Sequence, residues 1–134
     1  MKRATANGYL SHYILLRDAL PPDYEWCRCC TCGKLIRRLD RNCHAGHFVT
    51  KGHGGSSGVY WDERNIHAQC NNCNRWQEGN QVEYYPFMLE KYGQAVIDEL
   101  RLKHRLPRPN SIDEYGIYYR EAYKELKKKL GVTK

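Results

Sequence analysis

Apolar residues recur with the period of an α-helix near the carboxyl end of the chain. The positions that follow this period are Ile112, Tyr115, Tyr119, Ala122, Tyr123, Leu126 and Leu130. Ser111 and Glu114 form the pattern of a capping box, and Gly131 stands where a glycine commonly ends a helix. The sequence therefore predicts a helix that begins after Ser111 and ends before Gly131.

The amino-terminal stretch has a weaker pattern of the same kind. Residues 1–20 are compatible with a helix, with Ser11 as a candidate N-cap for His12–Ala19 and Pro21-Pro22 as the stop. Residues 23–80 differ in character, because they hold all the cysteines and most of the glycines. This middle part predicts short strands and loops around a metal.

Two more helices are predicted beyond the cysteine-rich part, over Val82–Leu89 and Gln94–Arg105, with a break near Gly93. The expected fold class is α+β. The expected division is an N-terminal helical arm, a metal-bound core and a C-terminal helical region that binds DNA or dimerises, namely residues 1–22, 23–80 and 81–134.

Charge and cysteine content narrow the class of protein. The formal net charge of +7 over 134 residues favours a polyanionic partner. Met1-Lys2-Arg3 is followed by no apolar run of signal-peptide or membrane-span length, so we expect a cytoplasmic protein without a membrane segment. Since cytoplasmic thiols stay reduced, clustered cysteines among the seven are expected to bind metal rather than to form disulfides.

Two C-x-x-C pairs predict a structural zinc site. The four ligands expected to close a tetrahedral site around Zn²⁺ are Cys29, Cys32, Cys70 and Cys73. Gly33, which follows the first pair, permits the tight turn that such a zinc knuckle needs. A redox-active pair is the main alternative, but it leaves the second pair unexplained.

Cys27-x-x-Cys30 is a rival spacing for the first knuckle, but it lacks the following glycine. Cys27, Cys30 and Cys43 are then spare thiols. We expect them to act as small buried hydrophobic residues, or alternatively as ligands of a second metal.

The segment between and after the knuckles resembles a treble-clef HNH (His-Me finger) nuclease of the zinc-pinned kind, similar to phage endonuclease VII-type junction resolvases. The four matching places are His47, Gly54-Gly55, Asn65 and Asn74. This resemblance implies a zinc-pinned treble-clef ββα-metal finger with flanking N- and C-terminal helices.

A closer resemblance is to the lambdoid-phage NinG (Rap) recombination family. The shared segments are Ala45-Gly46-His47-Phe48, Glu63–Cys70, Cys73-Asn74, Gly79-Asn80 and Gly93–Glu99. The likeness covers roughly residues 9–130, so we expect a compact member without a long N-terminal extension. It implies a phage protein of the bacterial cytoplasm that acts on branched DNA, including Holliday junctions and D-loops.

The residue types fit phosphodiester hydrolysis. His47 is the expected general base, since an imidazole titrates near neutral pH. Asn74 is the expected oxygen ligand of a catalytic Mg²⁺ or Mn²⁺ ion, and a helix N-cap is its alternative role. Asn65 is expected to tie the loop and orient His47. His67 is expected to assist the metal or contact phosphate, or alternatively to pack beside the zinc.

One position departs from the HNH pattern. Many such nucleases carry an aspartate or histidine directly before the base, and here that residue is Gly46. His44 is a candidate replacement, and His53 and Glu78 are weaker candidates for the site.

The resulting hypothesis is a metal-dependent endonuclease that nicks branched DNA as a C2 homodimer, because resolving a four-way junction needs two cuts. The alternative is a zinc-stabilised module that binds branched DNA without cutting it. A sequence-specific HNH endonuclease is a third reading, which the short chain disfavours because it offers no added recognition domain.

Overall fold

A computed structural model of the chain describes residues 1–49 and 54–134. Its regular elements are α1 (Arg3–Asp18), β1 (Trp26–Arg28), β2 (Leu35–Arg37), β3 (Cys43–His47), β4 (Ile66–Cys70), α2 (Gln81–Tyr92), α3 (Gln94–Lys103) and α4 (Ile112–Leu130). Short 3₁₀ turns span Gly54–Ser56 and Glu63–Asn65, and a π-helical turn spans Asn72–Trp76. The mixed α+β class is as predicted.

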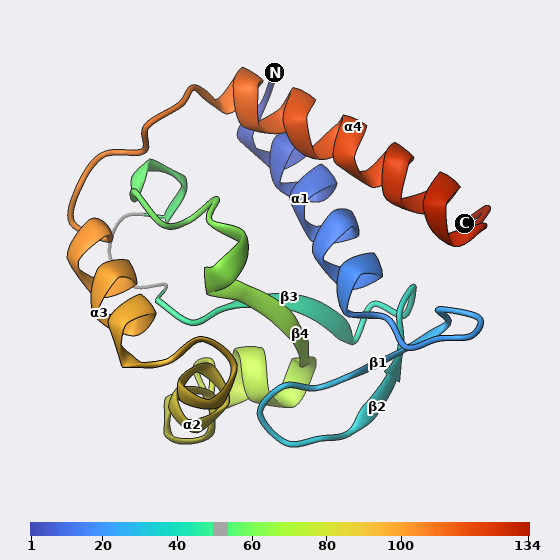
Figure 1. The fold of residues 1–134 in the computed structure, drawn as a ribbon, viewed down its shortest axis with the longest axis horizontal. Helices are drawn as coiled ribbons and strands as arrows, with labels where there is room; N and C mark the ends of the chain where they lie inside the picture. Colours follow the sequence, from blue (N-terminus) through green and yellow to red (C-terminus); the bar gives the residue numbers. More distant parts are fainter. Residues whose placement is uncertain (50–53) are drawn as a thin grey trace.

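The β3–β4 hairpin lies at the centre, between two pairs of helices (Figure 1). Its antiparallel register pairs Cys43 with Cys70 at one end and His47 with Ile66 at the other. Because side chains opposite each other point to the same face, the hairpin has two distinct faces. One face packs on α1, and the other contacts α2 through His67.

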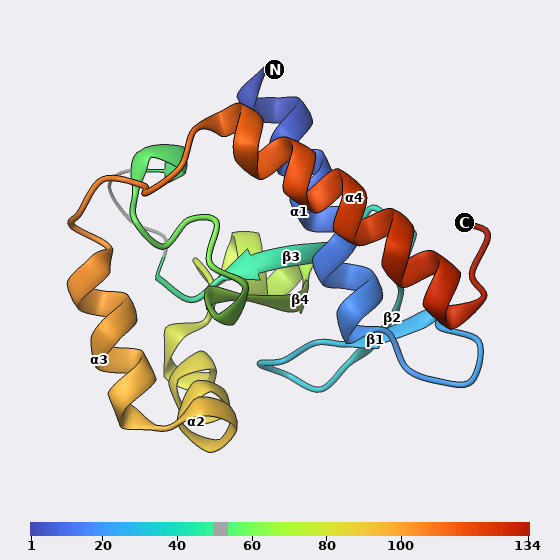
Figure 2. The ribbon, with the colours of Figure 1, turned by 45° about the horizontal axis from the view of Figure 1, so that its top comes forward.

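Helices α1 and α4 lie side by side across one face of this hairpin, although they come from opposite ends of the chain (Figures 1 and 2). Gly116 allows their close approach, since a Cβ there would lie 3.2 Å from the Cβ of Ala6. The amino terminus also contacts the start of α4, with its ammonium 2.6 Å from the Asp113 carboxylate.

The sequence-predicted boundaries of α1 need correction. Ser11 lies inside this helix and does not cap it, because α1 already begins at Arg3. The first half was missed because Thr5, Asn7 and Gly8 are weak helix formers and no side chain caps the start. Packing of Ala6 and Leu10 in the core stabilises this half instead.

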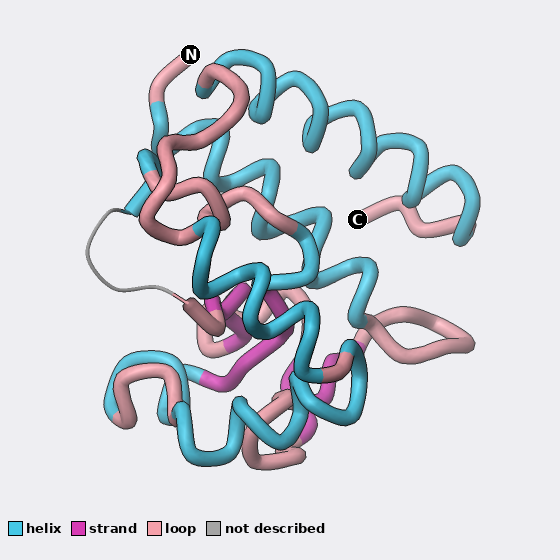
Figure 3. The backbone as a smooth tube through the Cα atoms, turned by 60° about the vertical axis from the view of Figure 1, so that its left-hand side comes forward, coloured by secondary structure: helices cyan, strands magenta, loops and turns pink. Residues whose placement is uncertain are grey.

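The other helix predictions are confirmed within a few residues. The capping box at Ser111 and Glu114 is present, and Gly131 ends α4 with a φ of 70°. Gly93 separates α2 from α3 with a φ of 90°, a conformation that favours glycine. Figure 3 shows these helices surrounding the few short strands. Among the described residues, none of the helices has the length and apolar character needed to cross a bilayer.

Candidate functional site

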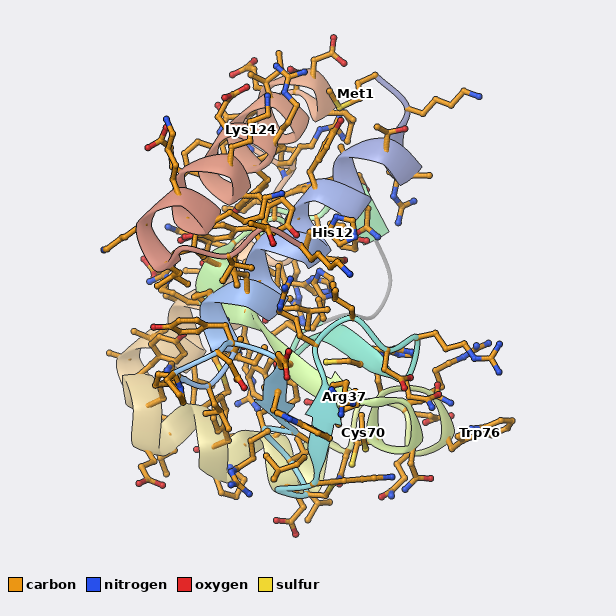
Figure 4. All side chains as sticks on the ribbon, turned by 90° about the vertical axis from the view of Figure 1, so that its right-hand side faces the viewer. Met1, His12, Arg37, Cys70, Trp76 and Lys124 are labelled. Carbon is orange, nitrogen blue, oxygen red and sulfur yellow. The ribbon has the colours of Figure 1, made fainter. Side chains whose placement is uncertain are left out.

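Two chain segments far apart in sequence bring four cysteines together. The Sγ atoms of Cys29, Cys32, Cys70 and Cys73 all lie within 4.8 Å of one another. The first two come from the turn between β1 and β2, where Gly33 has the predicted positive φ of 80°. The second two come from the end of β4 and the π-helical turn (Figure 4 labels Cys70).

The spacing of these sulfurs fits a zinc ion. Four thiolates at about 2.3 Å from a tetrahedral Zn²⁺ lie about 3.8 Å apart, and the Sγ atoms of Cys32 and Cys70 are 3.8 Å apart. Donors also point at the sulfurs, since the N–H of Cys73 lies 3.4 Å from Cys70 Sγ. Burial opposes ionisation of Cys29, but hydrogen bonds from Thr31 and backbone groups lower its pKa to about 6. The cluster is thus compatible with structural Zn²⁺.

The three remaining cysteines lie outside this cluster. Cys27 is fully buried and donates to the carbonyl of Leu15, while Cys43 is also buried. Cys30 is partly buried, and burial raises the pKa of its thiol. The geometry favours the knuckle that includes Cys29 and Cys32 over the rival Cys27-x-x-Cys30 spacing.

His47 is held in one tautomer at the end of β3. Its Nε2 lies 2.8 Å from the carbonyl oxygen of Tyr60, and its ring stacks on the Tyr60 ring at 4.3 Å between centroids. Because a carbonyl only accepts, Nε2 carries the proton and Nδ1 keeps a lone pair. No described residue forms a hydrogen bond with that Nδ1 atom. Within residues 1–49 and 54–134, the imidazole therefore presents a basic nitrogen without a hydrogen-bond partner.

The electrostatic surroundings keep His47 neutral. Burial and, to a smaller extent, the nearby Arg3 guanidinium lower its pKa to about 4, although the hydrogen bond to the Tyr60 carbonyl acts in the opposite direction. Arg3 also lies over the Tyr60 ring, 5.3 Å from its centroid. At pH 7 the side chain is therefore an unprotonated base beside a cation.

Asn65 ties the loop that follows His47. Its fully buried side-chain amide accepts from the N–H of Val49 at 2.8 Å and donates to the Val49 carbonyl at 2.9 Å. It also donates to the carbonyl of Val59. The loop-tying contact expected from the sequence is thus present. The hydrogen bonds of the Asn65 side chain go to Val49 and Val59, so an effect on the His47 ring would be transmitted through the loop.

Asn74 lies inside the π-helical turn, and its side chain does not cap a helix. Its Nδ2 lies 2.9 Å from Nδ1 of His44, whose Nε2 lies 3.0 Å from the Arg41 carbonyl. That carbonyl requires the proton on Nε2 of His44, so Nδ1 accepts from the amide of Asn74. The Oδ1 atom of Asn74 has no described hydrogen-bond partner and is available to a cation.

Gly46 is a glycine because Gln69 fills the space beside it. A Cβ at position 46 would overlap Gln69 Oε1 and lie 3.0 Å from Gln69 Cβ. The Gln69 amide nitrogen is fixed by the Gly79 carbonyl at 2.8 Å and by Thr31. Its Oε1 is buried without a described partner. The expected acidic ligand at 46 is therefore absent for a steric reason.

His67 lies in the interior, and both of its ring nitrogens have partners. Tyr84 donates its hydroxyl proton to the Gly46 carbonyl, so His67 Nδ1 donates to Tyr84, and Nε2 accepts from Tyr92. Burial lowers the pKa of His67 to about 3. This ring has no lone pair left for a metal and no N–H left for a phosphate, so its position supports the packing alternative.

The structure does not bring all the predicted site residues together in one place. In the hairpin register His47 faces α1, whereas His44 and His67 face the opposite side with Gln69. His47 and Asn74 therefore lie on opposite faces. Glu78 follows the π-helical turn and is exposed, while His53 lies outside the described residues.

The sequence interpretation did not identify two residues that contribute to the candidate site. Tyr60 orients His47 through its main-chain oxygen, which no side-chain motif reveals. Gln69 stands opposite His44 in the register. Its strand parity with His67 was the available signal, since residues two apart in a strand share a face.

Comparison with known proteins gives one consistent family. The family described as "Bacteriophage Lambda NinG protein" matches residues 8–131. The ninG protein of Salmonella phage P22 is 36% identical over 77 residues, which cover 58% of this chain and 36% of that protein. The ninG protein of Escherichia phage lambda is 34% identical over 76 residues, which cover 57% and 35%.

The matched region thus spans about a third of the length of these curated relatives. No solved structure matches the chain.

Proposed function

This chain belongs to the Bacteriophage Lambda NinG protein family, and we propose that it is an endonuclease that hydrolyses phosphodiesters in branched DNA. The observation that supports this most is His47, a neutral imidazole with one nitrogen fixed on Tyr60 and the other without a partner among the described residues. A base prepared in this way can take the proton of an attacking water.

The order of the elements supports a zinc-pinned HNH finger. A knuckle between β1 and β2 precedes the central hairpin, and the second knuckle leads directly into a helical turn. His47 ends the first strand of the hairpin, and Asn65 precedes the second. These are the places that the treble-clef resemblance assigns to the base and to its orienting asparagine.

The low pKa of His47 suits a site that binds a phosphate. Burial disfavours the imidazolium in the free protein. An incoming phosphodiester adds a negative charge that favours the protonated ring, so the pKa rises toward neutrality as the substrate binds. Arg3, which lies over the Tyr60 ring that stacks on His47, offers a cation for that phosphate.

The proposal also includes a catalytic Mg²⁺ or Mn²⁺ ion, for which the chain offers few ligands. Asn74 Oδ1 is a suitable oxygen ligand, His44 would hold the Asn74 amide in place, and waters and DNA phosphate would complete the ligand set. Such a cation, when bound, would offset charge on the leaving oxygen. Because Asn74 and His47 lie on opposite faces, the base and the metal site need separate tests.

The proposal that the substrate is branched DNA rests on the resemblance to the NinG (Rap) recombination family. The net charge of +7 is consistent with binding to a nucleic acid. We propose that the protein works in the cytoplasm of the phage's host as a C2 homodimer with two cutting sites, and that residues 81–134 contact DNA or the second copy. Helix α4 carries exposed Lys124, Lys128 and Lys129 in this region.

The second candidate is a module that binds branched DNA without cutting it. Two observations favour it: Gln69 excludes a ligand at position 46, and His47 is separated from Asn74. The candidates differ in whether divalent cations produce nicks.

Incubating the zinc-loaded protein with a synthetic four-way junction and a matched linear duplex, with Mg²⁺, Mn²⁺ or no added cation, tests the enzyme. We expect metal-dependent nicking of the junction, a loss of at least about 100-fold in His47→Ala, and full activity in His12→Ala. His12 is an exposed histidine of α1 and serves as the matched control.

Asn74→Ala and His44→Ala are expected to raise the concentration of Mn²⁺ needed for half-maximal nicking. Tight junction binding with no cleavage under any cation would establish the second candidate instead.

A further inference from the structure

Trp76 is an exposed aromatic residue with no partner in the described chain. Its side chain is 77% exposed, whereas Trp61 is 2% exposed. The third tryptophan, Trp26, is covered by Arg37 at 4.5 Å. No described ring or cation lies against Trp76, and Figure 4 shows it projecting outward from the π-helical turn. A large apolar ring is thus presented to a ligand, since neither the core nor a cation uses it.

The backbone beneath this ring is firmly held. Asn72–Trp76 begins beside the metal-binding Cys70 and contains Cys73. The Gln77 N–H donates to the Asn72 carbonyl, and the Gly79 N–H donates to the Cys73 carbonyl. Because the supporting turn is already ordered, the binding of a ligand that stacks on Trp76 carries little entropic cost for ordering the backbone.

Two arginines lie on this turn and on a segment next to it. Arg75 precedes Trp76, and the turn that holds Arg41 contacts the same region through His44 and Asn74. Both guanidinium groups are exposed, and neither forms an ion pair with a residue in 1–49 or 54–134.

The carboxylates nearest in sequence are engaged elsewhere. Asp40 accepts from the N–H of Asn42, and Glu78 already has a partner in the chain. An exposed aromatic ring on a turn that carries one exposed arginine and is linked to the turn of another matches a nucleic-acid strand, whose bases stack and whose phosphates are negative.

We propose that Trp76 is a stacking platform for an unpaired nucleobase, with Arg41 and Arg75 contacting the phosphates beside that base. This inference rests on the proposed action on branched DNA and names the part of the DNA that is recognised. Bases in an intact duplex are already stacked on their neighbours, so the platform selects strands with open bases, such as those at a branch. Trp76 and Asn74 belong to the same π-helical turn, although residues two apart in such a turn point to different sides.

The test measures binding without added Mg²⁺ or Mn²⁺, so that no cleavage is needed. The probes are a labelled oligothymidylate single strand and a blunt duplex of the same length. Trp76→Leu keeps an apolar side chain without the ring, and Trp76→Phe keeps a ring. Leu102→Ala is the matched control, since it removes apolar surface that is 71% exposed on a different helix.

We expect Trp76→Leu to weaken single-strand binding by roughly 5- to 150-fold, the range for loss of one base–aromatic stack. Duplex binding should change little, Trp76→Phe should retain most of the affinity, and Leu102→Ala should match the wild type. Oligothymidylate should also quench tryptophan emission in the wild type far more than in Trp76→Phe. Arg41→Ala and Arg75→Ala should each flatten the salt dependence of single-strand binding.

Unchanged single-strand affinity in Trp76→Leu would overturn the inference, and so would an equal loss for the duplex. It would also be overturned if the wild type bound no DNA, or if Trp76→Leu lowered only the oligomeric state in sedimentation, because the ring would then meet a second copy. A wild type that binds as expected but never cuts leaves the platform standing and refutes the endonuclease.

Discussion

At the scale of single residues, the contact between Gly46 and Gln69 determines what the site lacks. Gln69 is fully buried and anchored to Gly79, so it cannot move aside cheaply. The sequence shows a glycine where a ligand is usual, but the reason lies in a residue of the neighbouring strand.

Gly46→Ala should therefore destabilise the protein. The added Cβ overlaps a fixed side chain, and overpacking of this kind costs about 1–3 kcal/mol. Gly8→Ala is the control, because that helical glycine has open space around it, and it should stabilise by about 0.5–1 kcal/mol. Urea unfolding measures both, and adding Gln69→Ala to Gly46→Ala should recover part of the loss. Equal stability of Gly46→Ala and the wild type would contradict the steric explanation.

At the scale of elements, a chain of hydrogen bonds joins the central hairpin to α2. Tyr92 donates to His67, His67 donates to Tyr84, and Tyr84 donates to the Gly46 carbonyl. The chain requires His67 to be neutral, which agrees with its pKa of about 3. The junction of these two elements is therefore sensitive to acid.

The stability of the fold should fall as pH falls from about 6.5 toward about 3, because the unfolded chain binds a proton at His67 that the folded chain excludes. The slope from this residue is about 1.4 kcal/mol per pH unit at most. His67→Gln keeps a donor and an acceptor but does not titrate, so its stability should depend less on pH in this window. Urea unfolding at a series of pH values compares the two, and identical slopes would count against the assignment.

Helix α1 shows where prediction of an element from the sequence fails. Its second half follows from a periodic pattern, but its first half is helical because α4, from the other end of the chain, covers Ala6 and Leu10. The division into residues 1–22, 23–80 and 81–134 stays a prediction, and the extensive packing of α1 on α4 shows that the first and last parts share a core.

At the scale of the whole molecule, the four-cysteine cluster joins the β1–β2 turn to the end of the central hairpin. Neither two-stranded sheet is large enough to be stable alone. A metal at this junction would therefore contribute directly to folding, as structural zinc does in small domains.

We expect the purified protein to contain about one zinc ion per chain, with most of it lost in Cys70→Ser. Cys27→Ser should retain the metal, because Cys27 is outside the cluster and a serine can still donate to the Leu15 carbonyl. Elemental analysis gives the metal content, and a chelator should lower the thermal midpoint of the wild type. Full zinc content in Cys70→Ser would refute this ligand set.

The sequence by itself determined the features that depend on neighbours along the chain. These are the capping box and Gly131 of α4, the break at Gly93, and the pairing of Cys29-x-x-Cys32 with Cys70-x-x-Cys73. Local propensity, glycine conformation and ligand spacing act over a few residues, so they can be read directly.

Only the tertiary structure decided which side chains share a face and which are buried. Strand parity and register put His47 on the α1 face and Asn74 near His44 on the other. Burial between α2 and the hairpin committed both nitrogens of His67, and Gln69 closed the position beside Gly46. These outcomes depend on packing between segments distant in sequence, where volume and hydrogen-bond geometry, rather than residue type, select the arrangement.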